Sequence, residues 1–270
     1  MTAHGIHPGF HLRSVFLSDL HLGFRGCAAE LLTDFLERAR IDHLYLLGDI
    51  LDVSSLRRGF YWPKSHNRVV SAILRHARSG TRVVYVPGNH DEELRAFAGA
   101  LFGGVAIHGE YVHTTALGKR LWLTHGDQFD GVVRCSPLLA RLGTGIYDFL
   151  LGLNPLINAL RKFCDLPHGS LAAFLKVRVG SARRYIESFE HAVAHEARRR
   201  EFDGVVCGHI HHAALREIGG VLYCNDGDWV ESRTVLVEDF AGRLSLMRWP
   251  EQRAQLHPGL AHAPRLLDAA

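Results

Sequence analysis

Residues 83–91 read VVYVPGNHD, in which β-branched and aromatic residues run directly into a polar loop. A short apolar run of this kind, ended by Pro and Gly, predicts a buried strand. The pattern also occurs at residues 15–21 (VFLSDLH) and 44–49 (LYLLGD), and the stretches Ala28 to Ala39 and Asn67 to Ala77 carry apolar residues at helical spacing. Alternating strands and helices predict an α/β layered fold with ligand groups in the loops beyond the strand ends.

The same pattern returns later in the chain, at residues 121–127 (LWLTHGD), 205–211 (VVCGHIH) and 221–228 (VLYCNDGD). Residues 134–200 interrupt it with a leucine-rich segment that ends in a polar helix from Ser181 to Arg200. We predict a helical cap inserted between two core strands, because binding insertions sit on loops beyond strand ends. The alternative is that this segment is simply more core.

The composition predicts one globular domain over residues 1–270. The formal net charge of +3 is too small to indicate nucleic acid, but residues 134–200 hold 11 basic and 5 acidic side chains and form a basic insert on an acidic body. Residues 244–249 predict a last strand stopped by Pro250, and residues 251–270 predict a loosely attached C-terminal tail.

Five cysteines without a CxxC pair indicate reduced thiols. The chain begins without a charged-then-apolar signal pattern, and its most apolar stretch, residues 146–160, is interrupted by polar residues, Gly and Pro. We therefore expect a cytoplasmic protein, either free or in peripheral contact with the anionic surface of the inner membrane.

The chemistry of the chain is concentrated in five short motifs. They are Asp19-x-His21, Gly48-Asp49, Gly88-Asn89-His90-Asp91, His125-Gly126-Asp127 and Gly208-His209-x-His211. Each motif alone is weak, but all five follow apolar runs, and together they supply a mixed set of oxygen and nitrogen ligands. Such a set suits Mn²⁺, Fe²⁺ or Zn²⁺ rather than Ca²⁺, and it suffices for two ions.

The spacing within the motifs has a physical reason. Asp19 and His21 are two positions apart and would point the same way in an extended segment, and His209 and His211 would do likewise. Two ions about 3.5–4 Å apart need a shared ligand, and Asp49, alone on its loop, is the natural bridge. A glycine beside a ligand allows a close backbone approach or a positive φ.

These motifs resemble the calcineurin-like metallophosphoesterase superfamily, whose pattern is DxH, GD, GNH[DE], H and GHxH in that order. The resemblance implies a sandwich of two sheets flanked by helices, and a hydroxide bridging two metals as the nucleophile that attacks phosphorus. It implies one metal held by Asp19, His21, Asp49 and His211, and the other by Asn89, His125, His209 and the shared Asp49. His90 would face the scissile phosphate, with Asp91 or Asp52 orienting it or only capping loops.

Within the superfamily the chain is most similar to the group related to UDP-2,3-diacylglucosamine pyrophosphohydrolase, by its size, its motif spacing and the position of the insert. That resemblance implies Mn²⁺, a nucleotide-linked or lipid-linked phosphate substrate and a cap that shelters acyl chains. The lipid A enzymes of this group have Arg where His90 stands, so this chain departs from them. Arg57, Arg58, Tyr61 and Trp62 follow the Asp49 loop and are predicted to contact the substrate, or else to form a surface loop with an aromatic anchor.

Two other functions use the same core. A phosphodiesterase or nuclease on cyclic nucleotides or nucleic acid should show a continuous basic face, whereas the positive charge here is concentrated in a leucine-rich insert. A scaffold that has lost its chemistry should show broken ligand motifs, and all eight motif positions are intact.

Overall fold

Two mixed β-sheets form the centre of the molecule in the computed structural model, which describes residues 10–131 and 180–256. The first sheet has the order β12-β11-β1-β2-β3-β5-β4 and the second the order β6-β7-β8-β10-β9. The strands of the first sheet are β1 (Phe10–Leu17), β2 (Ala39–Leu47), β3 (Arg82–Val86), β4 (Leu101–Phe102), β5 (Val105–Ile107), β11 (Thr234–Glu238) and β12 (Leu244–Arg248). Those of the second are β6 (Tyr111–Thr114), β7 (Arg120–Leu123), β8 (Gly204–Cys207), β9 (Ala214–Ile218) and β10 (Val221–Asn225).

The sheets face each other across an apolar layer. Successive residues of a strand point to opposite faces, so Phe16 on β1 lies between the sheets while Val15 and Leu17 lie against the helices. Val206 on β8 and Leu121 on β7 meet Phe16 from the second sheet. Strands β1, β2 and β3 are parallel to one another, as are β7, β8 and β10. This arrangement brings the carboxyl ends of the predicted strands to one edge of each sheet.

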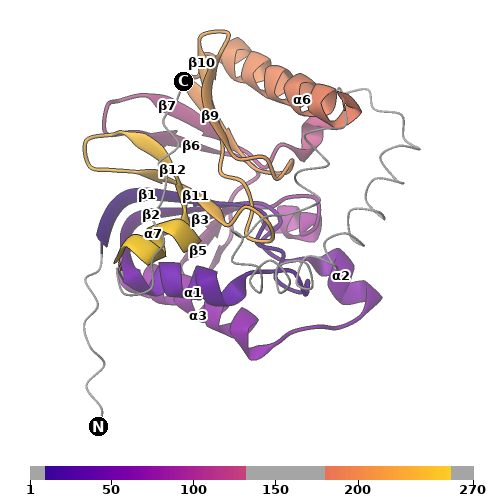
Figure 1. The fold of residues 1–270 in the computed structure, drawn as a ribbon, viewed down its shortest axis with the longest axis vertical. Helices are drawn as coiled ribbons and strands as arrows, with labels where there is room; N and C mark the ends of the chain where they lie inside the picture. The colour runs from indigo at the N-terminus through magenta and orange to yellow at the C-terminus, as the bar shows by residue number, and fades with distance from the viewer. Residues whose placement is uncertain (1–9, 132–179, 257–270) are drawn as a thin grey trace, which may run out of the picture.

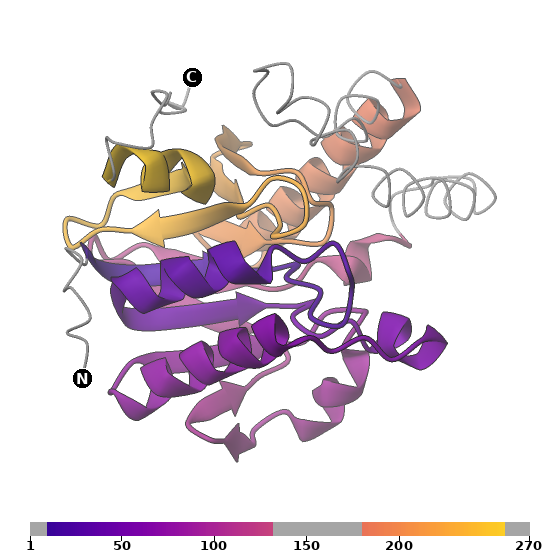
Figure 2. The same ribbon diagram turned by 60° about the horizontal axis from the view of Figure 1, so that its bottom comes forward.

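Helices cover the outer face of the first sheet. Figure 2 shows α1 (Ala29–Arg38), α3 (Lys64–Arg78) and α7 (Trp249–Leu256) packed side by side on it. Both α1 and α3 connect neighbouring parallel strands, as the alternation of strands and helices predicts. The predicted α/β fold of two sheets flanked by helices is confirmed.

Helix α6 (Gly180–Arg199) covers the outer face of the second sheet (Figure 1). Its apolar side, with Ile186, Phe189 and Val193, packs on Trp122 of β7 and Tyr223 of β10. This part of the predicted cap at 134–200 is therefore a core layer, because its apolar positions recur at helical spacing and match the outer face of the sheet. The remainder of the predicted cap, residues 134–179, lies outside the described residues.

The predicted last strand before Pro250 is β12, which ends at Arg248, and the chain continues beyond it as helix α7. Proline is well tolerated in the first turn of a helix, where its missing N–H has no intrahelical partner. Trp249 anchors the helix: its buried ring packs on Phe10 and Phe35, and its Nε1 donates to Asp34 Oδ2 at 3.1 Å. Of the predicted loose tail at 251–270, residues 251–256 are thus helical and residues 257–270 lie outside the described part. Within residues 10–131 and 180–256, no helix has the length and apolar character needed to cross a membrane.

A buried polar cluster joins the sheets at the end opposite the predicted ligand loops. The carboxylate of Glu238, on β11, accepts hydrogen bonds from Arg13 Nη1 and Ser14 Oγ, both at 2.6 Å, and lies 2.8 Å from His113 Nε2 on β6. Burial raises the pKa of Glu238, but the hydrogen bonds from His113 and Ser14 outweigh it and lower that pKa from 4.5 to about 2. Glu238 is thus held as a carboxylate inside the protein.

Glu238→Gln is expected to change the pH dependence of stability. A carboxyl whose pKa is lowered on folding stabilises the protein above pH 4.5, and this contribution disappears as the pH falls towards 2. The variant should therefore be less stable at pH 7, on the order of 2 kcal/mol, and approach the parent near pH 2–3. Urea unfolding between pH 2.5 and 7 measures the free energy of unfolding of the parent and of the variant against pH, with Glu217→Gln as a control at an exposed position. Parallel curves for the variant and the parent would contradict this role.

Candidate metal centre

All eight motif residues lie at the carboxyl ends of five strands. Asp19 and His21 follow β1, and Asp49 follows β2. Asn89 and His90 follow β3, His125 follows β7, and His209 and His211 follow β8. The described residues contain three overlapping groups of potential ligands whose atoms lie within 4.8 Å of one another: Asp19, His21 and His211; His21, Asp49 and His90; and Asp49, His125 and His209. The structure therefore brings the predicted ligand positions together.

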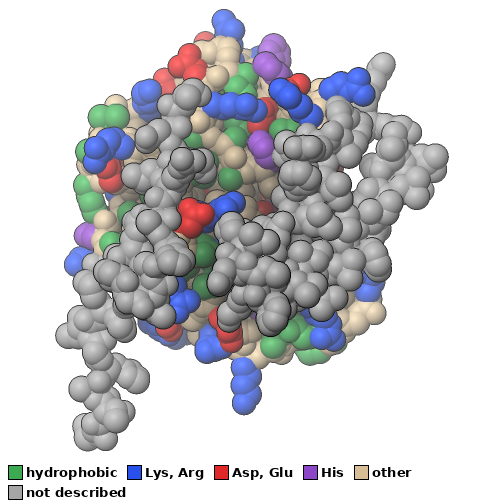
Figure 3. Space-filling model, viewed as in Figure 1, with side chains coloured by type: hydrophobic (Ala, Val, Ile, Leu, Met, Phe, Trp, Pro, Cys, Tyr) green, Lys and Arg blue, Asp and Glu red, His purple; other side chains and the backbone are tan. Residues whose placement is uncertain are grey.

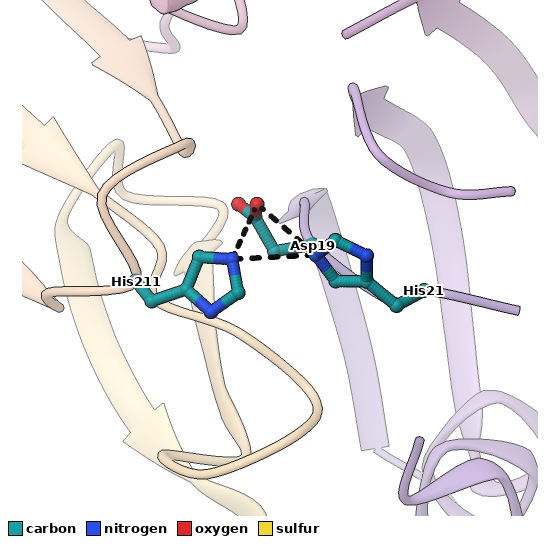
Figure 4. A group of neighbouring side chains, drawn as sticks. All are labelled: Asp19, His21 and His211. Atoms are coloured by element: carbon teal, nitrogen blue, oxygen red, sulfur yellow. Dashed lines mark hydrogen bonds and ion pairs between the residues drawn. The ribbon is translucent and has the colours of Figure 1, made fainter. Parts of the chain in front are cut away.

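The first group lies where the loops after β1 and β8 meet (Figure 4). Asp19 Oδ1 is 3.0 Å from His211 Nε2 and 3.8 Å from His21 Nε2, and the two imidazole nitrogens are 3.3 Å apart. Two imidazole nitrogens and a carboxylate oxygen pointing at one spot form a common donor set for a divalent transition metal. Asp19 is also fully buried, and a buried carboxylate needs a positive charge beside it, which a bound cation would supply.

The second group is centred on His125. Its Nε2 lies 3.3 Å from Asp49 Oδ2 and 3.3 Å from Asn89 Oδ1, and its Nδ1 is 2.8 Å from the carbonyl oxygen of Leu47. A carbonyl can only accept, so Nδ1 carries a proton and Nε2 is the nitrogen that can bind a metal. Asp49 belongs to two of the three groups, which is the position that a shared ligand would occupy. Its bridging role stays a prediction.

His90 is oriented by Asp52 rather than by Asp91. Asp52 Oδ1 lies 3.0 Å from His90 Nδ1, and Asp52 Oδ2 lies 3.3 Å from His21 Nδ1. Asp52 also accepts from the backbone N–H of Ser55 at 2.7 Å and so caps α2 (Val53–Arg58). One carboxylate therefore fixes two histidines and begins a helix.

Asp91 instead joins the Asp49 loop to its own. Its carboxylate accepts backbone N–H groups of Ile50 at 2.8 Å and Gly88 at 2.6 Å, together with the hydroxyl of Tyr85. This is the loop-forming alternative that the sequence left open for Asp91.

The backbone at the ligands is not extended, so that prediction is wrong. The φ angles are 52° at Asp19, 51° at His21, 53° at Asp49, 68° at His209 and 51° at His211. This left-handed conformation is uncommon outside glycine and recurs at functional sites. It arises because the turns are stabilised by contacts between loops, such as Asp19 N to Gly48 O at 3.0 Å and His21 N to Asp49 O at 2.9 Å.

Burial and charge act against each other at the centre. Burial raises the pKa of the Asp19 carboxyl, but the positive charge of His211 outweighs it and holds that pKa well below its usual range. The same balance with His125 lowers the pKa of Asp49. Burial lowers the pKa of His21, yet the hydrogen bond with Asp52 and the charge of Asp49 raise it to about 9. The buried carboxylates thus require positive charge, which protons supply here and a divalent ion would supply when bound.

Several residues that support the centre are absent from the five motifs. Ser18 Oγ lies 2.6 Å from Asp19 Oδ2 and 2.7 Å from Asp226 Oδ1, while Asn225 Nδ2 donates to the carbonyl of Gly208 at 2.7 Å. The sequence carries a signal for this loop, because the apolar run at residues 221–223 leads into the polar residues 224–228 in the same way as the runs before the five motifs.

The four predicted substrate residues lie in and after α2, downstream of Asp52. Arg57 Nη2 pairs with Glu93 at 2.6 Å, and Arg58 donates to Ser55 Oγ at 3.1 Å. Tyr61 stacks under the Arg25 guanidinium at 4.4 Å, and Trp62 Nε1 donates to Asn67 at 2.8 Å. These contacts, all within the described residues, lie outside the three ligand groups, so substrate contact by Arg57, Arg58, Tyr61 and Trp62 stays a prediction.

The family model for calcineurin-like phosphoesterases matches residues 12–213, and the chain belongs to this family. It is a metal-dependent phosphoesterase. No curated protein matches it.

Solved structures of similar proteins are distant. The phosphoesterase Yfce from E. coli is 14% identical, with a TM-score of 0.41 over 87% of this chain and 98% of that one. A predicted phosphoesterase from Streptococcus pneumoniae is 13% identical, with a TM-score of 0.38 over 88% and 90%. A Vps29 single mutant from Entamoeba histolytica is 15% identical, with a TM-score of 0.41 over 87% and 97%.

Gly208→Ala is expected to disrupt the centre without disrupting the fold. A Cβ at residue 208 would lie 2.1 Å from Ser18 Oγ and 2.4 Å from Asp19 Oδ2, so the Asp19 carboxylate must move. Mn²⁺ affinity, measured by calorimetry, should fall by at least about 10-fold. Gly109→Ala is the matched control, because a Cβ there meets nothing within 4 Å. Unchanged Mn²⁺ affinity in Gly208→Ala would show that Asp19 does not bind the ion.

Proposed function

We propose that the chain hydrolyses a pyrophosphate or phosphoester bond in UDP-2,3-diacylglucosamine or a related nucleotide-linked or lipid-linked substrate, using two divalent ions, with Mn²⁺ as the first choice and Fe²⁺ or Zn²⁺ as alternatives. The observation that carries the proposal is the convergence of three ligand groups that share Asp49 and His21. The donors are carboxylate and imidazole groups, which suit Mn²⁺, Fe²⁺ and Zn²⁺.

Asp19, His21, Asp49 and His211 would hold one ion, and Asp49, Asn89, His125 and His209 the other. Bound ions would lower the pKa of a water and neutralise charge on the phosphate oxygens. The protein's own contribution is to fix the ligands: Asp52 holds His21, and the carbonyl of Leu47 holds His125.

His90 is the residue proposed to act directly on the substrate. Its side chain is 30% exposed, whereas those of His21 and His125 are 8% and 1% exposed. Asp52 accepts from its Nδ1, which leaves Nε2 to donate a hydrogen bond or a proton to a phosphate or leaving-group oxygen.

The surroundings of α2 support a substrate with both phosphate and apolar parts. Arg57 and Arg58 end this helix, Phe60 follows with 82% of its surface exposed, and Arg25 lies over Tyr61. An exposed aromatic next to guanidinium groups suits a base, a sugar or an acyl chain beside a phosphate. The same groups would allow peripheral contact with an anionic membrane surface from the cytoplasmic side.

A phosphodiesterase that acts on cyclic nucleotides or nucleic acid is the second candidate. His90 favours it, because the lipid A enzymes have Arg at this position. The distribution of charge favours the first proposal: on the face shown in Figure 3, described Lys and Arg side chains are interspersed with acidic and apolar ones. The intact motif positions argue against a scaffold without catalysis.

Asp49→Asn is expected to lower activity by about 10³-fold, because it weakens a ligand shared by two groups. The assay follows UMP release from UDP-2,3-diacylglucosamine with Mn²⁺, beside bis-p-nitrophenyl phosphate and 2′,3′-cyclic AMP. Asp203→Asn, an exposed change remote from the ligand loops, should leave all three rates unchanged.

Full activity of Asp49→Asn would refute the shared-ligand mechanism. Hydrolysis of only the two simple diesters by the unmodified protein would instead remove the lipid-linked substrate and establish the second candidate.

His90→Gln is expected to separate protonation of the leaving group from metal binding. It should lower kcat for UDP-2,3-diacylglucosamine by 10²–10⁴-fold, the usual contribution of a general acid. A p-nitrophenyl ester, whose leaving group needs no proton, should lose much less. Equal losses on both substrates would assign His90 to charge stabilisation rather than to proton transfer.

A further inference from the structure

His209 has a hydrogen-bonded partner outside the three ligand groups, the carboxylate of Asp130. Its Nε2 lies 2.8 Å from Asp130 Oδ1, and the hydroxyl of Tyr185 donates to the same oxygen at 2.8 Å. Asp130 directly follows the 3₁₀ turn η2 (Asp127–Phe129), and Tyr185 belongs to α6. Three segments that are distant in the sequence therefore meet at one carboxylate.

The contact determines which nitrogen of His209 can bind an ion. An ionised carboxylate can only accept, so Nε2 carries the proton and the lone pair is on Nδ1. His209 belongs to the ligand group with Asp49 and His125, so Nδ1 is the atom it can offer there. His125 is fixed in the opposite sense, with its Nδ1 on the carbonyl of Leu47.

Packing also restricts the orientation of the His209 ring. The rings of His209 and His125 are 5.1 Å apart in an edge arrangement, and the ring of Phe189, one turn after Tyr185 on α6, is 5.8 Å from His209. Phe189 is fully buried, whereas 54% of the Asp130 side chain is exposed. Asp130 therefore depends on a directed hydrogen bond, and Tyr185 provides one.

We infer that Asp130 is a positioning residue of the metal centre, which fixes the tautomer and ring orientation of His209, and that Tyr185 of α6 holds Asp130 in place. A carboxylate behind a ligating histidine is a general way to orient the ring, and its loss usually costs 10- to 100-fold in metal affinity. The inference rests on the proposed role of His209 as a ligand. It makes α6 a support of the second ligand group as well as a layer of the core.

Calorimetric and spectroscopic titration of the full-length, metal-free protein with Co²⁺ tests this inference. The parent should bind two ions. Asp130→Ala should bind one ion with unchanged affinity and the other 10- to 100-fold more weakly, with an altered absorption band for that ion. Asp130→Asn, whose amide oxygen can still accept from Nε2, should recover most of the loss. Tyr185→Phe should weaken the same ion by a smaller factor.

Glu187→Gln is the matched control, because Glu187 is exposed on α6 two residues from Tyr185 and pairs with Arg183. Two ions bound equally tightly by Asp130→Ala and by the parent would overturn the inference and leave the proposed function intact. Failure of the parent to bind Co²⁺ would instead overturn the proposed function. If Asp130→Ala does not fold, an unchanged titration for Tyr185→Phe would contradict the positioning role.

Discussion

The burial of two carboxylates, Asp19 and Asp49, is the constraint that organises the molecule. Both are almost inaccessible to solvent, and buried negative charge is strongly unfavourable unless it is compensated. The compensation comes from histidines after β1, β3, β7 and β8, which belong to both sheets. The sheets therefore have to meet at their carboxyl edges, and the apolar layer around Phe16 keeps them in that position.

The fold and the ligand positions follow from local patterns in the sequence. Apolar runs that end in Gly, Asp or His identify β1, β2, β3, β7 and β8, and the motif residues after them meet in space. The conformation of the ligand loops does not follow, because the left-handed backbone of Asp19 is held by Gly48 on another loop. The roles of Asp130 and Ser18 could not be predicted from the sequence either, because their partners His209 and Asp226 lie 79 and 208 residues away. The sequence therefore predicts which strands are followed by ligand residues, whereas contacts between residues distant in the sequence determine the geometry of the ligand loops.

Helix α6 shows why the insert between the fourth and fifth motifs could be interpreted in two ways. Its composition is polar and basic, as expected of a cap, yet every third or fourth residue is buried against the second sheet. Phe189 belongs both to the core and to the surroundings of the ligand loops. A Cβ on Gly126 would lie 2.8 Å from its ring, and the ring also faces His209. One helix thus packs the core and lies beside the ligand loops.

The backbone N–H of Trp229 donates to the carbonyl of Asp19 at 3.1 Å, and β11 pairs with β1. The first ligand loop made by the ribosome is therefore supported by residues made more than two hundred positions later. While the chain is being synthesised, the early strands can pair, but the pocket for the ions is completed only when the last third of the chain has emerged. A chain truncated before residue 211 would therefore present the buried carboxylate of Asp19 without His211, the histidine whose charge compensates it.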